Sequence, residues 1–127
     1  MGGKRIEREG YFVEPTVFTG VRDEMVIARE EIFGPVICIL KFSTLDEVIR
    51  RANDCDYGLM AGVFTKSMAT ATRCANELKT GFVNVNRWFA MGMSVPLGGV
   101  KGSGFGREFG NEGLNNYLES KTVVYGF

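Results

Sequence analysis

Apolar residues along the chain recur with two different spacings, which predict strands and helices in alternation. Three short segments rich in β-branched and aromatic residues, at positions 35–42, 58–65 and 81–85, have the character of strands. Between them, residues 44–54 and 67–80 place apolar side chains three or four positions apart, as on one face of a helix. The order strand, helix, strand, helix, strand predicts an α/β fold with a βαβαβ portion built on a parallel sheet.

Polar residues at the helix ends support these two helices. Thr44 and Glu47 have the T-x-x-E spacing of a capping box, and Ser67 is a favourable N-cap residue. Lys79 and Gly81 are typical of a helix C-terminus. We therefore expect both helices to begin and end close to these residues.

The C-terminal part of the chain changes character. Residues 87–107 are rich in glycine and show no periodicity. A loop of this length inside a compact domain is usually functional, disordered or the sign of a misassigned element. A short helical stretch at 111–118 and a β-like run at 122–127 follow. A sheet of this small size has open edges, and such edges usually pair with another strand.

Charge and residue counts exclude several classes of function. Lys plus Arg and Asp plus Glu both number 15, so the chain lacks the positive charge that nucleic-acid binders use. The absence of histidine excludes Ser-His-Asp and Cys-His catalysis within this chain, and no metal site is expected. The longest apolar run, residues 36–40, is far too short for a membrane span, and we expect no signal peptide.

The three cysteines do not have the surroundings of a nucleophile. Cys38 lies in a predicted strand and Cys74 on the apolar face of a predicted helix, so both are expected to pack in the core. Cys55 lies between two acidic residues, a setting that does not favour a reactive thiolate. We therefore expect no catalytic residue in this chain. The cysteines are odd in number and widely spaced, which does not suit a disulfide framework and favours a reducing, cytoplasmic location.

A turn before the first predicted strand carries candidate binding residues. Pro35 disfavours helical backbone at the residue before it, so the chain must turn there. Turns of this kind often form ligand sites in α/β sheets. The carboxylate of Glu31 could accept both hydroxyls of a ribose, and Phe33 could pack against a flat ring. The alternative, a solvated surface glutamate, is the commoner situation for this residue type.

Two further segments have alternative interpretations. The glycines of residues 98–106 fit neither G-x-x-x-x-G-K-[ST] nor G-x-G-x-x-G, so a tight backbone crossing is favoured over a phosphate loop. The loop at 86–93 is rich in large apolar side chains, which indicates either a pocket wall or packing onto the core.

Several motifs follow one another along nearly the whole chain from Gly10 onward. They are G-Y-F-V-E-P-T-V at 10–17, E-E-I-F-G-P-V at 30–36, N-D-C-D-Y-G-L at 53–59, G-F-V-N-V-N at 81–86, P-L-G-G-V-K-G-S-G at 96–104, G-R-E at 106–108 and L-N-N-Y-L-E-S-K-T-V at 114–123. In this order and spacing, the motifs resemble the C-terminal part of the aldehyde dehydrogenase superfamily, and a branch like the betaine aldehyde dehydrogenases fits the resemblance.

The resemblance implies an enzyme that oxidises an aldehyde to a carboxylic acid with NAD or NADP as cofactor. In that family the glutamate of E-x-F-G-P binds the nicotinamide ribose, which implies this role for Glu31, with Phe33 beside the nicotinamide. The segment after the G-F-V-N-V-N motif lines the substrate tunnel of the family. The residues that this implies for the tunnel are Phe89, Met91 and Leu97.

The resemblance also implies how the chain is organised. Residues 1–118 correspond to the C-terminal portion of the catalytic domain. Residues 119–127 resemble the oligomerisation strand that joins the sheet of a neighbouring subunit, which implies a homo-oligomer. Family members are several times longer, and they supply the Rossmann domain, the catalytic cysteine, the general-base glutamate and the oxyanion-hole asparagine from upstream. We therefore expect this chain alone to be inactive.

Two other functions remain open at this point. The chain could be a non-catalytic interaction module that retains a remnant of this fold and pairs through its edge strand. It could also be an independent nucleotide-binding domain, although the glycine spacing argues against that. The sequence upstream of this chain would distinguish all three.

Overall fold

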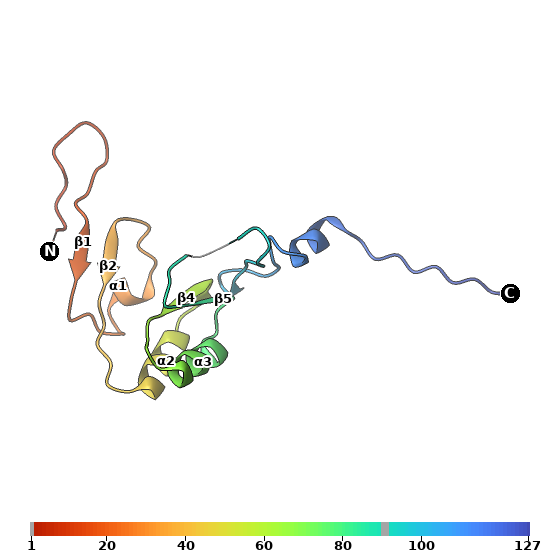
Figure 1. Cartoon of the computed structure of the whole chain (residues 1–127). Coiled ribbons are helices and arrows are strands. Elements are labelled where there is room, and N and C mark those ends of the chain that lie inside the picture. Colours follow the sequence, from red (N-terminus) through yellow and green to blue (C-terminus); the bar gives the residue numbers. More distant parts are fainter. Residues whose placement is uncertain (1, 90–91) are drawn as a thin grey trace. The chain divides into compact units, whose positions relative to one another are not determined.

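The computed structural model describes residues 2–89 and 92–127 (Figure 1). The chain forms two compact units, Met1–Arg51 and Ala52–Phe127. Each unit contains one parallel strand pair together with helical segments. The predicted α/β fold class with parallel strands is therefore confirmed.

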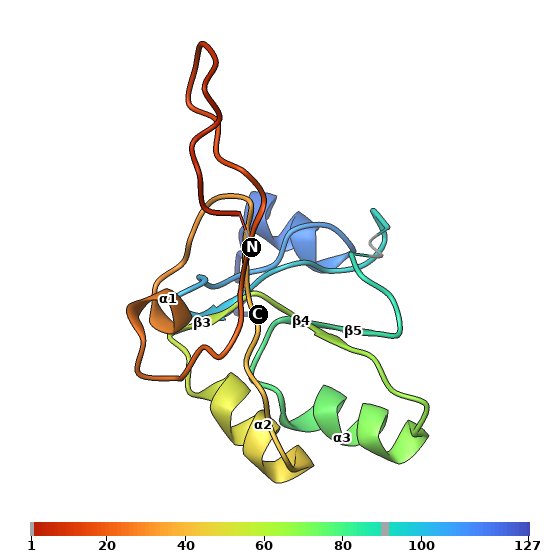
Figure 2. The same cartoon turned by 90° about the vertical axis from the view of Figure 1, so that its left-hand side faces the viewer.

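The first unit is built on strands β1 (Thr16–Phe18) and β2 (Val36–Cys38), which pair in parallel with Thr16 opposite Val36. The short helix α1 (Val26–Arg29) lies between them in the sequence. Before β1, residues 4–14 form a narrow loop closed by a bridge between Arg5 and Val13 (Figure 2). The pattern of apolar residues did not predict β1, because a strand of three residues after a proline is too short to show a period.

Helix α2 (Leu45–Asn53) confirms the predicted helix and most of its predicted cap. The hydroxyl of Thr44 accepts a hydrogen bond from the Glu47 N–H at 3.2 Å, as a capping box requires. The Glu47 carboxylate accepts the N–H of Ser43 at 2.9 Å, so the return bond reaches one residue further back than in the usual motif. Of the predicted apolar face, Ile49 is buried.

The second unit contains a strand–helix–strand motif in which β4 and β5 are parallel and α3 connects them. The pairing runs from Met60 opposite Phe82 to Val63 opposite Val85. Helix α3 lies along this pair in both views, and its Ala71 and Cys74 are buried (Figures 1 and 2). The elements of this unit are β3 (Tyr57–Gly58), β4 (Met60–Val63), α3 (Met68–Glu77), β5 (Phe82–Val85), β6 (Val100–Lys101) and the 3-10 helix η1 (Glu112–Tyr117).

The cap of α3 is the predicted one, since the Ser67 hydroxyl accepts the N–H of Thr70 at 3.2 Å. The strand predicted at 58–65, however, is two strands, β3 and β4. Strand β3 pairs antiparallel with β6, which lies in the glycine-rich segment. The predicted βαβαβ sheet is thus divided into three two-stranded sheets, β1–β2, β3–β6 and β4–β5. Long-range pairing, rather than local pattern, decides this division.

The end of the chain agrees with the prediction in part. The helical stretch predicted at 111–118 is the 3-10 helix η1. Residues 119–127, all of which are described, form no strand within this chain, and Val124 is 85% exposed. The oligomerisation strand therefore stays a prediction. Of the helices in the described part of the chain, none has the length and hydrophobicity that crossing a lipid bilayer would require.

Candidate functional site

The turn that carries Glu31 is fixed by a run of backbone hydrogen bonds. Helix α1 ends where the N–H of Glu30 donates to the carbonyl of Val26 at 2.9 Å. Gly34 then donates to Ile32 at 2.8 Å, which tightens the chain within three residues. The carbonyl of Pro35 accepts the N–H of Thr16 at 2.8 Å, so the turn leads straight into the β1–β2 pair. The turn predicted from Pro35 is present.

Both candidate side chains of this turn are open to a ligand. Within the described residues, the Glu31 carboxylate has no hydrogen-bond or ion-pair partner, and its side chain is exposed. The ring of Phe33, two positions further on, is 96% exposed. A carboxylate only accepts hydrogen bonds, so its two oxygens suit the two hydroxyls of a ribose. The residues of the turn therefore fit the ribose and ring of a nicotinamide nucleotide, while the roles of Glu31 and Phe33 stay predictions.

Three charged side chains of the first unit form an ion-pair network. Its members are Asp23, before α1, and Glu47 and Arg51, both on α2. Hydrogen bonds from Arg51 lower the pKa of Asp23, and the same contact raises the pKa of Arg51. The pKa of Glu47 is lowered first by the Ser43 N–H and then by Arg51. All three groups are thus held in their charged forms. The sequence pattern identified Glu47 only as a capping residue and did not identify Asp23 or Arg51.

In the second unit, Asn86 sets the start of the loop that the resemblance assigns to the substrate tunnel. Its N–H donates to Val63 at 2.8 Å, which continues the β4–β5 pairing. Its side chain accepts the Thr65 N–H at 2.8 Å and donates to the Thr65 carbonyl at 2.9 Å. The backbone of Asn86 is left-handed, with φ of +54°, a conformation that asparagine adopts more readily than most residues. The Asn86 side chain therefore bonds to the backbone of Thr65 in place of a further strand residue, at the point where the chain leaves β5 and the loop begins.

The predicted tunnel residues fall on the loop that follows. Phe89 is exposed and has a left-handed backbone, with φ of +51°. Leu97 is half-buried, and Met91 lies outside the described residues. The ring of Trp88 covers Gly62 of β4, since a Cβ at Gly62 would come within 2.9 Å of it. The tunnel roles of Phe89, Met91 and Leu97 stay predictions.

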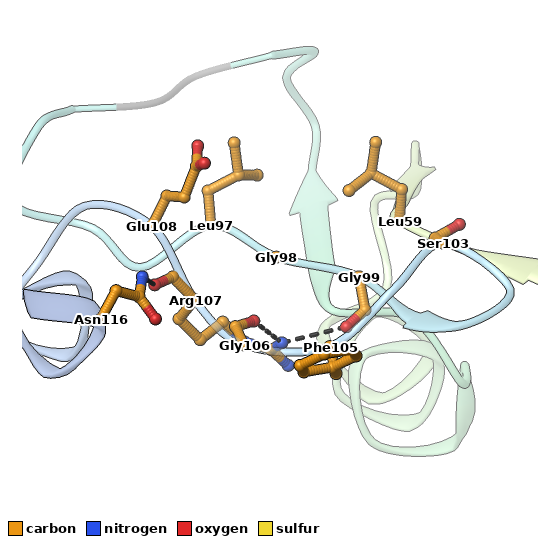
Figure 3. Close-up of a pocket in the computed structure, with 10 residues that line it drawn as sticks. All are labelled: Leu59, Leu97, Gly98, Gly99, Ser103, Phe105, Gly106, Arg107, Glu108 and Asn116. Carbon is orange, nitrogen blue, oxygen red and sulfur yellow. Dashed lines mark hydrogen bonds between the residues drawn. The ribbon is translucent and has the colours of Figure 1, made fainter.

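A cavity of about 300 Å³ lies beside Leu97, which is at the small end of the range for ligand pockets (Figure 3). The side chains of Leu59, Leu97 and Glu108 point to the same side of the surrounding loops. The opposite wall is fixed by Arg107, whose Nη1 donates to the carbonyls of Gly99 at 3.0 Å and Gly106 at 2.6 Å. The lining residues are Leu59, Leu97, Gly98, Gly99, Ser103, Phe105, Gly106, Arg107, Glu108 and Asn116.

The glycine-rich segment is a tight backbone crossing, as the sequence favoured. A Cβ at Gly81 would lie 1.6 Å from the carbonyl oxygen of Gly98, so the two backbones are almost in contact. Gly104 and Gly106 have left-handed backbones, with φ of +106° and +83°. The amine of Lys101 donates to the carbonyls of Asn53 and Cys55 at 3.0 and 2.9 Å. Lysine here serves the packing of the loop.

The three cysteines are free thiols, and their positions match the predicted packing in part. Cys74 is buried on α3, and Cys38 is half-buried on β2, where its thiol donates to the carbonyl of Ile27 at 3.6 Å. Cys55 is exposed and its sulfur accepts the N–H of Tyr57 at 3.5 Å.

Comparison with known proteins gives one consistent result. The family model described as "Aldehyde dehydrogenase family" matches residues 1–123. The chain is 56% identical over 123 residues to "Aldehyde dehydrogenase family 2 member B4, mitochondrial" of Arabidopsis thaliana, a match that covers 97% of this chain and 23% of that protein. It is 53% identical to "Aldehyde dehydrogenase, cytosolic 1" of Mus musculus, with 97% of this chain and 25% of that protein covered.

The structural comparison agrees. The "NAD+ complex structure of aldehyde dehydrogenase from bacillus cereus" superposes with a TM-score of 0.94 at 50% identity, and the match covers 97% of this chain and 25% of that one. The chain thus spans about a quarter of the length of the relatives that it matches. The family model, the sequence relatives and the solved structure all match nearly the whole length of this chain. The chain therefore belongs to the aldehyde dehydrogenase family.

Proposed function

We propose that this chain is the part of an NAD(P)-dependent aldehyde dehydrogenase that holds the nicotinamide ribose and shapes the substrate tunnel, in an enzyme that oxidises an aldehyde to a carboxylic acid. The observation that carries the proposal is the Glu31 turn. Its carboxylate has no partner among the described residues, and an exposed aromatic ring follows two positions later. Family membership, and the NAD+ named for the relative from Bacillus cereus, support the same assignment.

In this proposal each site residue has a distinct task. Glu31 accepts hydrogen bonds from both ribose hydroxyls, and Phe33 packs against the nicotinamide side of the nucleotide. NAD or NADP, held by these two residues, would supply the hydride acceptor for the oxidation. Phe89, Met91 and Leu97 give the tunnel apolar walls, which favour an apolar or aromatic aldehyde. The catalytic thiol and base come from other parts of the enzyme.

The proposal is tested by assaying the full-length protein that contains this segment. We expect NADH or NADPH to form only when aldehyde is added, for aliphatic or aromatic aldehydes. The 127-residue chain by itself is the blank, and it should give no turnover, because Glu31 and the tunnel residues bind and orient but do not react. A full-length protein inactive with every aldehyde and both cofactors would contradict the proposal, as would turnover by the isolated chain.

We further propose that residues 119–127 form the strand that joins subunits of a homo-oligomer, and that residues 1–118 belong to the catalytic domain. The exposure of Val124 and Tyr125 supports this, since both apolar side chains lack cover within their own unit. Removing residues 119–127 from the full-length protein should lower its molecular mass in sedimentation velocity to that of a smaller assembly. An unchanged mass would contradict the assignment.

The three free cysteines suit a reducing, cytoplasmic location.

A further inference from the structure

One arginine of the first unit is held at four points. The Nε and Nη2 atoms of Arg51 donate to the two carboxylate oxygens of Asp23 at 2.7 and 2.8 Å. Its Nη1 donates to the Glu47 carboxylate at 2.8 Å and to the carbonyl of Lys41 at 2.7 Å. The Arg51 side chain is only 21% exposed. A two-pronged contact of this kind fixes orientation as well as distance, which a single ion pair does not.

Asp23, the partner of Arg51, also holds the far end of α1. Its backbone carbonyl accepts the Nε of Arg29 at 2.7 Å. Arg29 is the last residue of α1, and Glu31 follows two positions later. One residue is therefore attached to α2 through its side chain and to the end of α1 through its backbone. This attachment links α2 to the turn that carries Glu31.

Helix α1 needs such an attachment, because it has little stability of its own. It has four residues, no side-chain hydrogen bond at its N-cap, and no acidic residue in its first turn. A helix this short does not persist in water without contacts from outside. The C-terminal side of the Glu31 turn is anchored separately, by the hydrogen bond between Thr16 and Pro35. The N-terminal side is attached in two ways: the Cys38 thiol of β2 donates to the carbonyl of Ile27 at 3.6 Å, and Asp23 joins Arg29 at the end of α1 to Arg51 on α2.

We propose that Arg51, acting through Asp23, is a positioning residue that fixes where the Glu31 carboxylate meets the nicotinamide ribose. This inference rests on the proposed function of Glu31. The competing view is that the contact only stabilises the fold. Partly exposed ion pairs usually contribute little to stability, so that view predicts small effects that do not depend on whether Glu31 is present.

A double-mutant cycle in the full-length enzyme separates the two views. Four proteins are compared: the parent, Arg51→Gln, Glu31→Gln, and the variant with both changes. NADH affinity is measured by fluorescence titration without aldehyde, and the burst of NADH formation by stopped flow. Arg73→Gln is the matched control, because it breaks an ion pair with Glu77 that lies on the surface of α3 in the other unit. Asp23→Asn replaces Arg51→Gln in the cycle if the arginine variant fails to fold.

We expect Arg51→Gln to weaken NADH binding and slow the burst by roughly fivefold or more, and to have no further effect once Glu31 is replaced. Arg73→Gln should leave both readouts unchanged. Equal effects of Arg51→Gln in the presence and absence of Glu31, or no effect at all, would overturn the proposal. If Glu31→Gln alone leaves affinity and burst unchanged, the proposed function fails first, and the positioning role fails with it.

Discussion

In the full-length enzyme, replacing Glu31 by Gln is expected to slow the burst of NADH formation by roughly 10- to 150-fold, which corresponds to the loss of one hydrogen bond to a charged group, about 1.5–3 kcal/mol. Glutamine has nearly the same shape, so the change removes charge and acceptor capacity without creating a cavity. The effect should fall on hydride transfer, because the ribose contact sets where the nicotinamide carbon lies relative to the substrate. Stopped-flow absorbance measures it.

Two controls decide whether the effect belongs to Glu31 itself. Glu30→Gln makes the same change one position earlier, at another exposed residue, and should leave the burst unchanged. Alkylation of the catalytic thiol should keep its rate in Glu31→Gln, because Glu31 is assigned no part in that step. If Glu31 is only a solvated surface charge, Glu31→Gln will match Glu30→Gln in both burst rate and cofactor affinity.

The two longer helices were predictable because their signals are local. Thr44 and Ser67 each cap a helix through the N–H three residues ahead, so the sequence alone contains both partners. The turn at Glu31 was predictable for the same reason, since Pro35 restricts its neighbour directly.

Strand pairing was predicted less well, because partners distant in sequence decide it. Strand β3 pairs with β6, which lies more than forty residues later in the sequence. The hydrogen bond from the Gly58 N–H to the Ser103 hydroxyl likewise joins residues 45 positions apart. Asp23 and Arg51 are 28 positions apart, so the spacing of residues along the chain does not predict their contact either. The cofactor and tunnel roles came from resemblance to a family, since no spacing within this chain distinguishes a ribose-binding glutamate from a solvated one.

The backbone crossing at Gly81 should be the least tolerant position in the second unit. A Cβ there would lie 1.6 Å from the Gly98 carbonyl oxygen and 2.7 Å from its carbon. Neither segment can move aside easily: the Gly81 N–H donates to the carbonyl of Gly58 at 3.0 Å, and a Cβ at Gly99 would come within 2.5 Å of Ser103. The backbone of Gly81 is not left-handed, so the requirement is for space rather than for an unusual conformation.

Gly81→Ala in the full-length protein is therefore expected to lower the free energy of unfolding by about 3 kcal/mol or more, at the upper end of overpacking effects. Gly126→Ala is the matched control, because nothing lies within 4 Å of its added Cβ. Gly62→Ala should fall between them, since its Cβ would meet the Trp88 ring, a side chain that can move. Urea midpoints at equal m-values measure the series. A midpoint for Gly81→Ala equal to that of Gly126→Ala would mean that the crossing beside Leu97 is looser than its geometry requires.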